Sequence, residues 1–124
     1  MSVSEGIQAE PCEVSVSRQN GWVVLRVVEE EIDLYMAENF KAAIQGEMKD
    51  AVPMVIDLSQ VKYLDSMTLG ALVTAHKQVR HLGGLLHIVS SYEGIARMFE
   101  ITGLHRVFEL FDTLESATAS KPGV

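Results

Sequence analysis

The sequence has one cysteine, Cys12, and only three prolines among its 124 residues. A single thiol cannot form an internal disulfide, and no ligand set for a metal can be assembled around it. No stretch approaches the roughly 20 consecutive apolar residues that a membrane-spanning helix requires, so we expect no membrane insertion. The first ten residues have neither a basic nor an apolar stretch, which leads us to expect no signal peptide and a cytoplasmic protein.

Basic residues are also scarce, because 10 lysines and arginines stand against 17 aspartates and glutamates, for a formal charge of −7. Proteins that bind nucleic acid need a basic surface to displace counterions, so we expect no nucleic-acid partner. The acidic residues gather in residues 28–50, whereas residues 62–87 carry a small basic excess. This asymmetry reflects either two differently solvated faces or an interface at which charge matters to a partner.

Motifs for catalysis are missing as well. The sequence contains no GxxxxGK[ST] phosphate loop, no GxGxxG turn, no GxSxG nucleophile elbow and no HExxH pair. Asp57 and Asp65 are the one conceivable carboxylate pair, but the loop between them leaves their separation open. His76 lies on an apolar helical stripe, which favours a core histidine over a metal ligand. We therefore expect no enzyme, no cofactor and no metal site.

The apolar pattern, in contrast, is well defined, since 48% of the residues are hydrophobic. Glu13–Gln19 alternates apolar and polar residues, Asn20-Gly21 favours a tight turn, and Trp22–Val28 is β-branched, which together predict a β-hairpin. The pattern then changes to a spacing of four residues and predicts an amphipathic helix that begins near Asp33. Its apolar stripe consists of Met36, Phe40, Ile44 and Met48.

The rest of the chain alternates strands and helices. The expected strands are Met54–Leu58, Leu85–Val89 and Val107–Phe111, and the expected helices run over about Ser66–His81, Tyr92–Thr102 and Thr113–Ala119. Residues 59–64 are expected to be a simple connection. The order β-β-α-β-α-β-α-β-α predicts an α/β fold with crossover connections and a partly parallel sheet, whose helices lie mainly on one face. One domain is expected over residues 13–119, between flexible segments at 1–12 and 120–124.

One segment singles out a family. Residues 54–70 read MVIDLSQVKYLDSMTLG, an apolar strand, a loop and then Asp65-Ser66-Met67-Thr68-Leu69-Gly70. This string resembles the STAS domain of bacterial anti-sigma factor antagonists, whose pattern is Asp-Leu-Ser followed by Asp-Ser-[Ser/Thr]-Gly-Leu-Gly. Further matches lie in register along residues 13–119, and their positions are Glu30-Glu31-Ile32-Asp33, Gly83-Gly84-Leu85 and Met98 to Leu104.

The resemblance implies a STAS-like domain with a mixed sheet of four or five strands. It also implies a regulator that sequesters an anti-sigma factor, often a serine kinase, and so releases a sigma factor. The phosphorylated residue of the family corresponds to Ser66, with Thr68 as the alternative acceptor. The partner-binding residues that the resemblance implies are Asp33, Asp65, Ser66, Met67 and Thr68. A phosphatase is a further implied partner, and a monomer or weak dimer is expected.

Two positions of the Asp65–Gly70 motif depart from the family pattern, and Glu30, in place of a glycine before the first helix, is a smaller departure. Met67 replaces a small hydroxyl residue, and Thr68 replaces a glycine, which places a side chain where a kinase would approach. Met67 is interpreted either as an apolar anchor for a partner or as an isolated surface methionine. Ser66 itself has an alternative explanation, since serine is common at helix N-termini. In that case the protein would be a constitutive STAS subunit of a transporter or another regulatory assembly, without a phosphoswitch.

Overall fold

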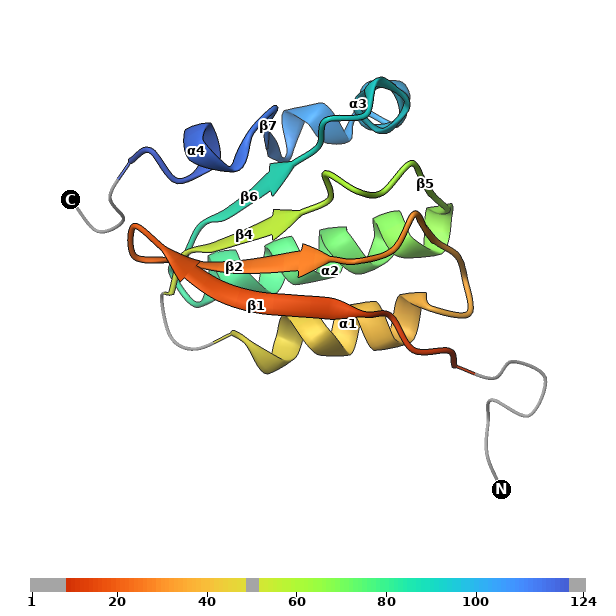
Figure 1. Ribbon diagram of the computed structural model, residues 1–124, viewed down its shortest axis with the longest axis horizontal. Coiled ribbons are helices and arrows are strands. Elements are labelled where there is room, and N and C mark those ends of the chain that lie inside the picture. Colours follow the sequence, from red (N-terminus) through yellow and green to blue (C-terminus); the bar gives the residue numbers. More distant parts are fainter. Residues whose placement is uncertain (1–8, 49–51, 121–124) are drawn as a thin grey trace.

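A mixed five-stranded sheet forms the centre of the molecule in a computed structural model that describes residues 9–48 and 52–120 (Figure 1). In spatial order its strands are β1 (Val14–Gln19), β2 (Trp22–Val27), β4 (Met54–Asp57), β6 (Leu86–Val89) and β7 (Glu109–Phe111). The β1–β2 pair is antiparallel, and the three other pairs are parallel. The predicted mixed α/β sheet is therefore confirmed, and so is the hairpin, whose turn residues Asn20 and Gly21 have φ of 52° and 85°.

Three helices provide the crossovers between parallel strands. They are α1 (Ala37–Gly46), α2 (Ser66–His81) and α3 (Glu93–Ile101). α1 and α2 lie side by side behind the sheet in Figure 1. The main core joins all three helices to one sheet face and includes Leu25, Ile56 and Ile88 from the strands. The expected placement of the helices mainly on one face is confirmed.

The short helix α4 (Leu114–Ala117) packs on the opposite face, against β6 and β7. A second, smaller core lies beneath it and contains Trp22, Val24, Val55, Val89 and Ala117. α4 is shorter than the expected helix over Thr113–Ala119. Between α3 and β7, a 3-10 turn, η1 (Leu104–Arg106), follows Gly103, and the last strand begins at Glu109 rather than at the expected Val107.

A second, two-stranded sheet was not expected from the sequence. Its strands β3 (Glu31–Ile32) and β5 (Tyr63–Leu64) are parallel. The prediction that residues 59–64 form only a connection was therefore wrong, because two-residue strands are too short to produce a period-two pattern. The expected helix start near Asp33 was also early, since α1 begins at Ala37 and residues 33–36 form a turn.

Of the two terminal segments, the structure describes residues 9–12 and residue 120. Residues 1–8 and 121–124 of the expected flexible segments lie outside the described residues. The Glu10 N–H donates to the Tyr35 carbonyl at 2.7 Å, and the Glu10 carbonyl accepts from the Asn39 side chain at the same distance. At the other end, the Trp22 indole N–H donates to the Ser120 carbonyl at 2.8 Å.

Candidate functional site

The β3–β5 pairing places the start of α2 beside the turn that leads into α1. Ile32 lies opposite Leu64, so Asp33 and Asp65 are the residues that follow the two paired strands. The Ile32 carbonyl accepts from the Asp65 N–H at 3.3 Å and from the Thr68 hydroxyl at 3.1 Å. Two segments about thirty residues apart in the sequence are thereby joined at one site.

Asp65 is the N-cap of α2. Its Oδ1 accepts from the Thr68 N–H at 3.0 Å and from the Thr68 hydroxyl at 3.1 Å. An aspartate in this position satisfies an otherwise unpaired N–H and places negative charge at the positive end of the helix dipole. Ser66 is then the first residue of the helix, and its side chain is not needed as the cap.

The three residues after Asp65 differ sharply in exposure. Ser66 is exposed, Met67 is 62% exposed, and Thr68 is fully buried with its hydroxyl donating to Ile32. Burial of Thr68 disfavours it as the alternative acceptor, since an enzyme could reach its hydroxyl only by opening the start of the helix. The side chain that replaces the family glycine therefore points into the protein, away from the surface around Ser66.

Asp33 has a structural task of its own. Its Oδ1 accepts from the N–H groups of Tyr35 and Met36, at 3.0 and 3.2 Å, and so fixes the turn before α1. This turn presents Leu34 and Tyr35 to solvent, with 40% and 43% exposure. Neither Leu34 nor Tyr35 was predicted from the sequence to be a site residue. Apolar residues that closely follow a turn-fixing aspartate are nevertheless a sequence signal for an exposed apolar patch.

Tyr63 on β5 is a further exposed apolar residue next to this turn. We use the term Ser66 face for five exposed residues on or directly after the paired strands, namely Leu34, Tyr35, Tyr63, Ser66 and Met67. Contiguous exposed apolar side chains often mark a protein interaction surface. The exposed serine and these exposed apolar side chains thus come from the two paired strands and the residues that follow them.

A hollow of about 260 Å³ between α1 and α2 adjoins the Ser66 face. Ser66, Met67 and Gly70 line it from α2, and Glu38 and Lys41 line it from α1. The Lys41 ammonium lies 3.4 Å from a Glu38 carboxylate oxygen. A cation is consequently available on the same hollow as the serine hydroxyl, although it is already paired with an acid on its own helix.

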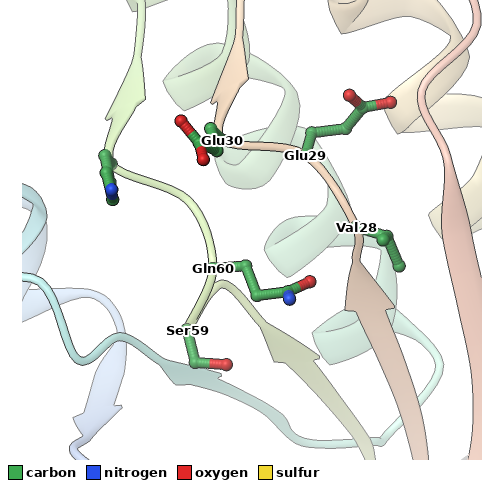
Figure 2. A pocket seen from close by; sticks show the side chains of 6 residues that line it. Val28, Glu29, Glu30, Ser59 and Gln60 are labelled. Atoms are coloured by element: carbon green, nitrogen blue, oxygen red, sulfur yellow. The ribbon is translucent and has the colours of Figure 1, made fainter.

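A second hollow, of about 330 Å³, lies where β2 and β4 end (Figure 2). Figure 2 shows Val28, Glu29 and Glu30 on one side and Ser59 and Gln60 on the other, and Lys62 completes the lining. Acidic and basic groups are mixed here. The parallel strands all advance in the same direction along the sheet, so there is no topological switch point of the kind at which open α/β sheets bind ligands.

Asp57, the other aspartate of the conceivable carboxylate pair, has local partners of its own. Asp57 is buried, with its Oδ2 3.4 Å from Arg26 Nε and its Oδ1 accepting from the Ser59 N–H at 2.9 Å. Since Asp65 is engaged by Thr68, the two aspartates serve separate local structures. Among residues 9–48 and 52–120, no three histidine, cysteine or acidic side chains are grouped to hold a metal. No helix in that part of the chain has the length and apolarity to cross a membrane.

Comparisons with known proteins agree with this geometry. The family model described as STAS domain matches residues 13–117. An anti-sigma-B factor antagonist from Listeria monocytogenes is 37% identical over 81 residues, which cover 64% of this chain and 71% of that protein. The crystal structure of an anti-sigma factor antagonist from Mycobacterium paratuberculosis has a TM-score of 0.79 and 28% identity, covering 91% of this chain and 97% of that one.

The same fold occurs in SpoIIAA, described as a Bacillus cell fate determinant and solved in its phosphorylated form. That structure has a TM-score of 0.62 at 18% identity, and the match covers 86% of this chain and 97% of that one. The sequence match spans both sheets, all three crossover helices and the Asp65–Gly70 motif. This chain belongs to the STAS domain family.

Proposed function

We propose that this protein is a cytoplasmic, non-enzymatic anti-sigma factor antagonist that binds an anti-sigma factor through the Ser66 face, and that phosphorylation of Ser66 weakens this binding. The names of its relatives support the role. The observation that carries the switch is the contrast within one helical turn, where Ser66 is exposed and free of the capping bond while Thr68 is buried.

A phosphate on Ser66 is compatible with the fold. It would stand in the first turn of α2, where unpaired N–H groups and the helix dipole favour an anion. The cap bond from Asp65 to the Thr68 N–H would remain in place. Phosphorylation therefore changes the surface without requiring the helix to move. A modification that leaves the fold intact can be added and removed reversibly.

The same phosphate alters the partner surface strongly. It adds about −1.5 to −2 charges at pH 7 next to the Asp65 carboxylate. In this proposal the exposed apolar side chains of the Ser66 face, Met67 above all, anchor the partner, and a dianion next to Met67 would have to be desolvated when that partner binds. Binding of the unmodified form is consequently favoured over binding of the phosphorylated form.

The proposed kinase is the partner itself or an associated protein, since the described residues carry no catalytic constellation. A phosphatase would reverse the mark. The family glycine replaced by Thr68 does not conflict with kinase access, because the threonine side chain is turned toward Ile32. Asp33 and Asp65 contribute by holding the two turns of the binding surface rather than through free carboxylates.

The modification site is tested with the captured cognate kinase and ATP. Wild-type protein should gain one phosphate that mass spectrometry maps to Ser66, and Ser66→Ala should remain unmodified. Serine at this position is the first helical residue and exposed, so Ser66→Ala and Ser66→Asp should each change the free energy of unfolding by less than about 1 kcal/mol. Phosphate mapped to Thr68, with Ser66 untouched, would contradict the assignment.

The switch is tested by calorimetric titration of the captured partner. Ser66→Ala should bind like wild type, whereas Ser66→Asp should bind about 30-fold more weakly, equivalent to about 2 kcal/mol, and the phosphoprotein more weakly still. Met67→Ala should weaken binding in a manner independent of salt. Equal affinities for all forms would favour the alternative of a constitutive STAS subunit without a phosphoswitch.

A further inference from the structure

β1 forms one edge of the main sheet, and among the described residues no strand pairs with its outer side. Its hydrogen-bonding pattern follows from the register. The Glu13 carbonyl accepts from the Val28 N–H at 2.9 Å, and in an antiparallel pair such bonded positions recur at every second residue. Ser15 and Ser17 therefore turn their backbone groups toward β2, and Val14, Val16 and Arg18 turn theirs outward.

Within β1 itself, the described residues carry little of the usual protection of an edge strand against pairing. No proline or bulge interrupts the six paired residues of β1, and Arg18 is its only charged residue. Val16 is 46% exposed at the middle of the strand. β7, at the opposite edge of the sheet, is only three residues long and offers a much shorter ladder.

We propose that β1 pairs antiparallel with β1 of a second copy of this chain, about a twofold axis at Val16, so that the two five-stranded sheets form one continuous sheet. In this register Val16 lies opposite the same residue of the second copy. Ser15 lies opposite Ser17, Val14 opposite Arg18, and Glu13 opposite Gln19. No like charges face one another, and the two valines form an apolar pair at the axis.

The ends of β1 select this register. A pairing centred on Ser17 would place Val14 opposite Asn20, which has a left-handed φ of 52° in the hairpin turn. A pairing centred on Ser15 would place Arg18 opposite Cys12, where the chain has left the sheet and runs toward Tyr35. Only the pairing about Val16 aligns residues 13–19 of one copy with residues 13–19 of the other.

Pairing of one edge with itself gives a closed dimer. A twofold contact uses the same patch on both subunits and leaves no growing end, whereas β1 against β7 would be a head-to-tail contact that can continue indefinitely. The formal charge of −7 on each copy opposes association at long range. The dimer should therefore strengthen as salt screens this repulsion, the reverse of a contact held by ion pairs.

The dimer is tested by sedimentation velocity over a concentration series. Wild type should show a concentration-dependent equilibrium between monomer and dimer. Val16→Lys brings two ammonium groups together at the axis and should raise the dimer dissociation constant at least about tenfold. Ile101→Lys is the matched control, because Ile101 is a 79% exposed aliphatic residue on α3, away from the β1 edge, and this variant should behave like wild type. A wild type that remains monomeric throughout, or equal dimerisation of the two lysine variants, would overturn the proposal.

Cross-linking tests the register independently. In a background of Cys12→Ser, Val16→Cys should form an intermolecular disulfide, since residues opposite one another at a hydrogen-bonded pair are about 5.5 Å apart between Cα atoms, within disulfide range. Arg18→Cys should not, because each copy's residue 18 faces residue 14 of the other. Efficient cross-linking of Arg18→Cys, with none at Val16→Cys, would overturn the register. Both results are independent of whether Ser66 is ever phosphorylated.

Discussion

His76 lies on α2 with its ring against the core. Its Nδ1 is buried without a hydrogen-bond partner among the described residues, and its ring meets Phe108 edge-on, with centroids 5.1 Å apart. Burial lowers the pKa of His76, and the Arg80 guanidinium one turn further along α2 lowers this pKa again. The contact with Phe108, a core residue, places the His76 ring against the core on the apolar stripe of α2.

This lowered pKa predicts a pH dependence of stability. In the unfolded chain His76 takes up a proton near its ordinary pKa of 6.5, whereas in the folded chain it does so only at lower pH. The unfolded state therefore binds more protons just below pH 6.5, and the free energy of unfolding should fall as the pH falls through that range. His76→Phe keeps an aromatic ring and removes the proton site. In urea unfolding below pH 6.5, the free energy of unfolding of this variant should fall less with falling pH than that of wild type. An equal fall for the two proteins would contradict the prediction.

At the scale of the element, two glycines have opposite roles. Gly70 lies inside α2, and a methyl group added there would meet nothing within 4 Å. Gly103 has a φ of 78° between α3 and η1, a left-handed conformation that other residues adopt at a cost. One residue type therefore weakens a helix at one position and permits a turn at the other.

The matched pair of alanine variants should move stability in opposite directions. Gly70→Ala should raise the free energy of unfolding by about 0.5–1 kcal/mol, since alanine loses less backbone entropy in a helix. Gly103→Ala should lower it by about 1–2 kcal/mol because of the left-handed φ. Urea unfolding measures both. A destabilised Gly70→Ala would show that the start of α2 does not tolerate the extra methyl group, and its partner binding should then be measured as well.

At the scale of the whole molecule, α4 and the residues that follow it up to Ser120 pack on the second face of the sheet. The Trp22 and Phe111 rings enclose the His87 imidazole, with centroids 4.4 and 4.6 Å from it, and His87 Nδ1 lies 2.9 Å from the Ala117 carbonyl. Gln19 at the end of β1 and Asn20 in the hairpin turn donate to Thr118. The last element is thus connected to the first hairpin across the entire sheet.

Loss of packing under α4 should therefore reduce global stability. Leu114→Ala removes an apolar side chain that packs on the second core and should lower the free energy of unfolding by about 2 kcal/mol. Glu115→Ala, on the exposed side of the same helix, is the control and should change it by less than about 0.5 kcal/mol. Fluorescence of Trp22, the only tryptophan, can follow both unfolding transitions. Equal effects would show that α4 does not support the fold.

Much of the fold could be predicted from the sequence because its signals are local. Alternation before Asn20-Gly21 identifies the hairpin, and the spacing of Phe40 and Ile44 identifies the buried side of α1. The Asp65 cap and the long apolar stripe that follows it identify α2. Propensity, capping and amphipathic periodicity act over a few residues, so one sequence suffices to read them.

Tertiary structure alone decided which residues of the candidate site are available. Ser66, Met67 and Thr68 are adjacent in the sequence, yet Thr68 is buried because the carbonyl of Ile32, from a distant strand, lies within reach of its hydroxyl. The exposed neighbours Tyr35 and Tyr63 join the site only through the β3–β5 pairing. Local patterns determined the longer helices and strands of this protein, and its proposed binding surface arose from contacts between segments about thirty residues apart, which no local pattern encodes.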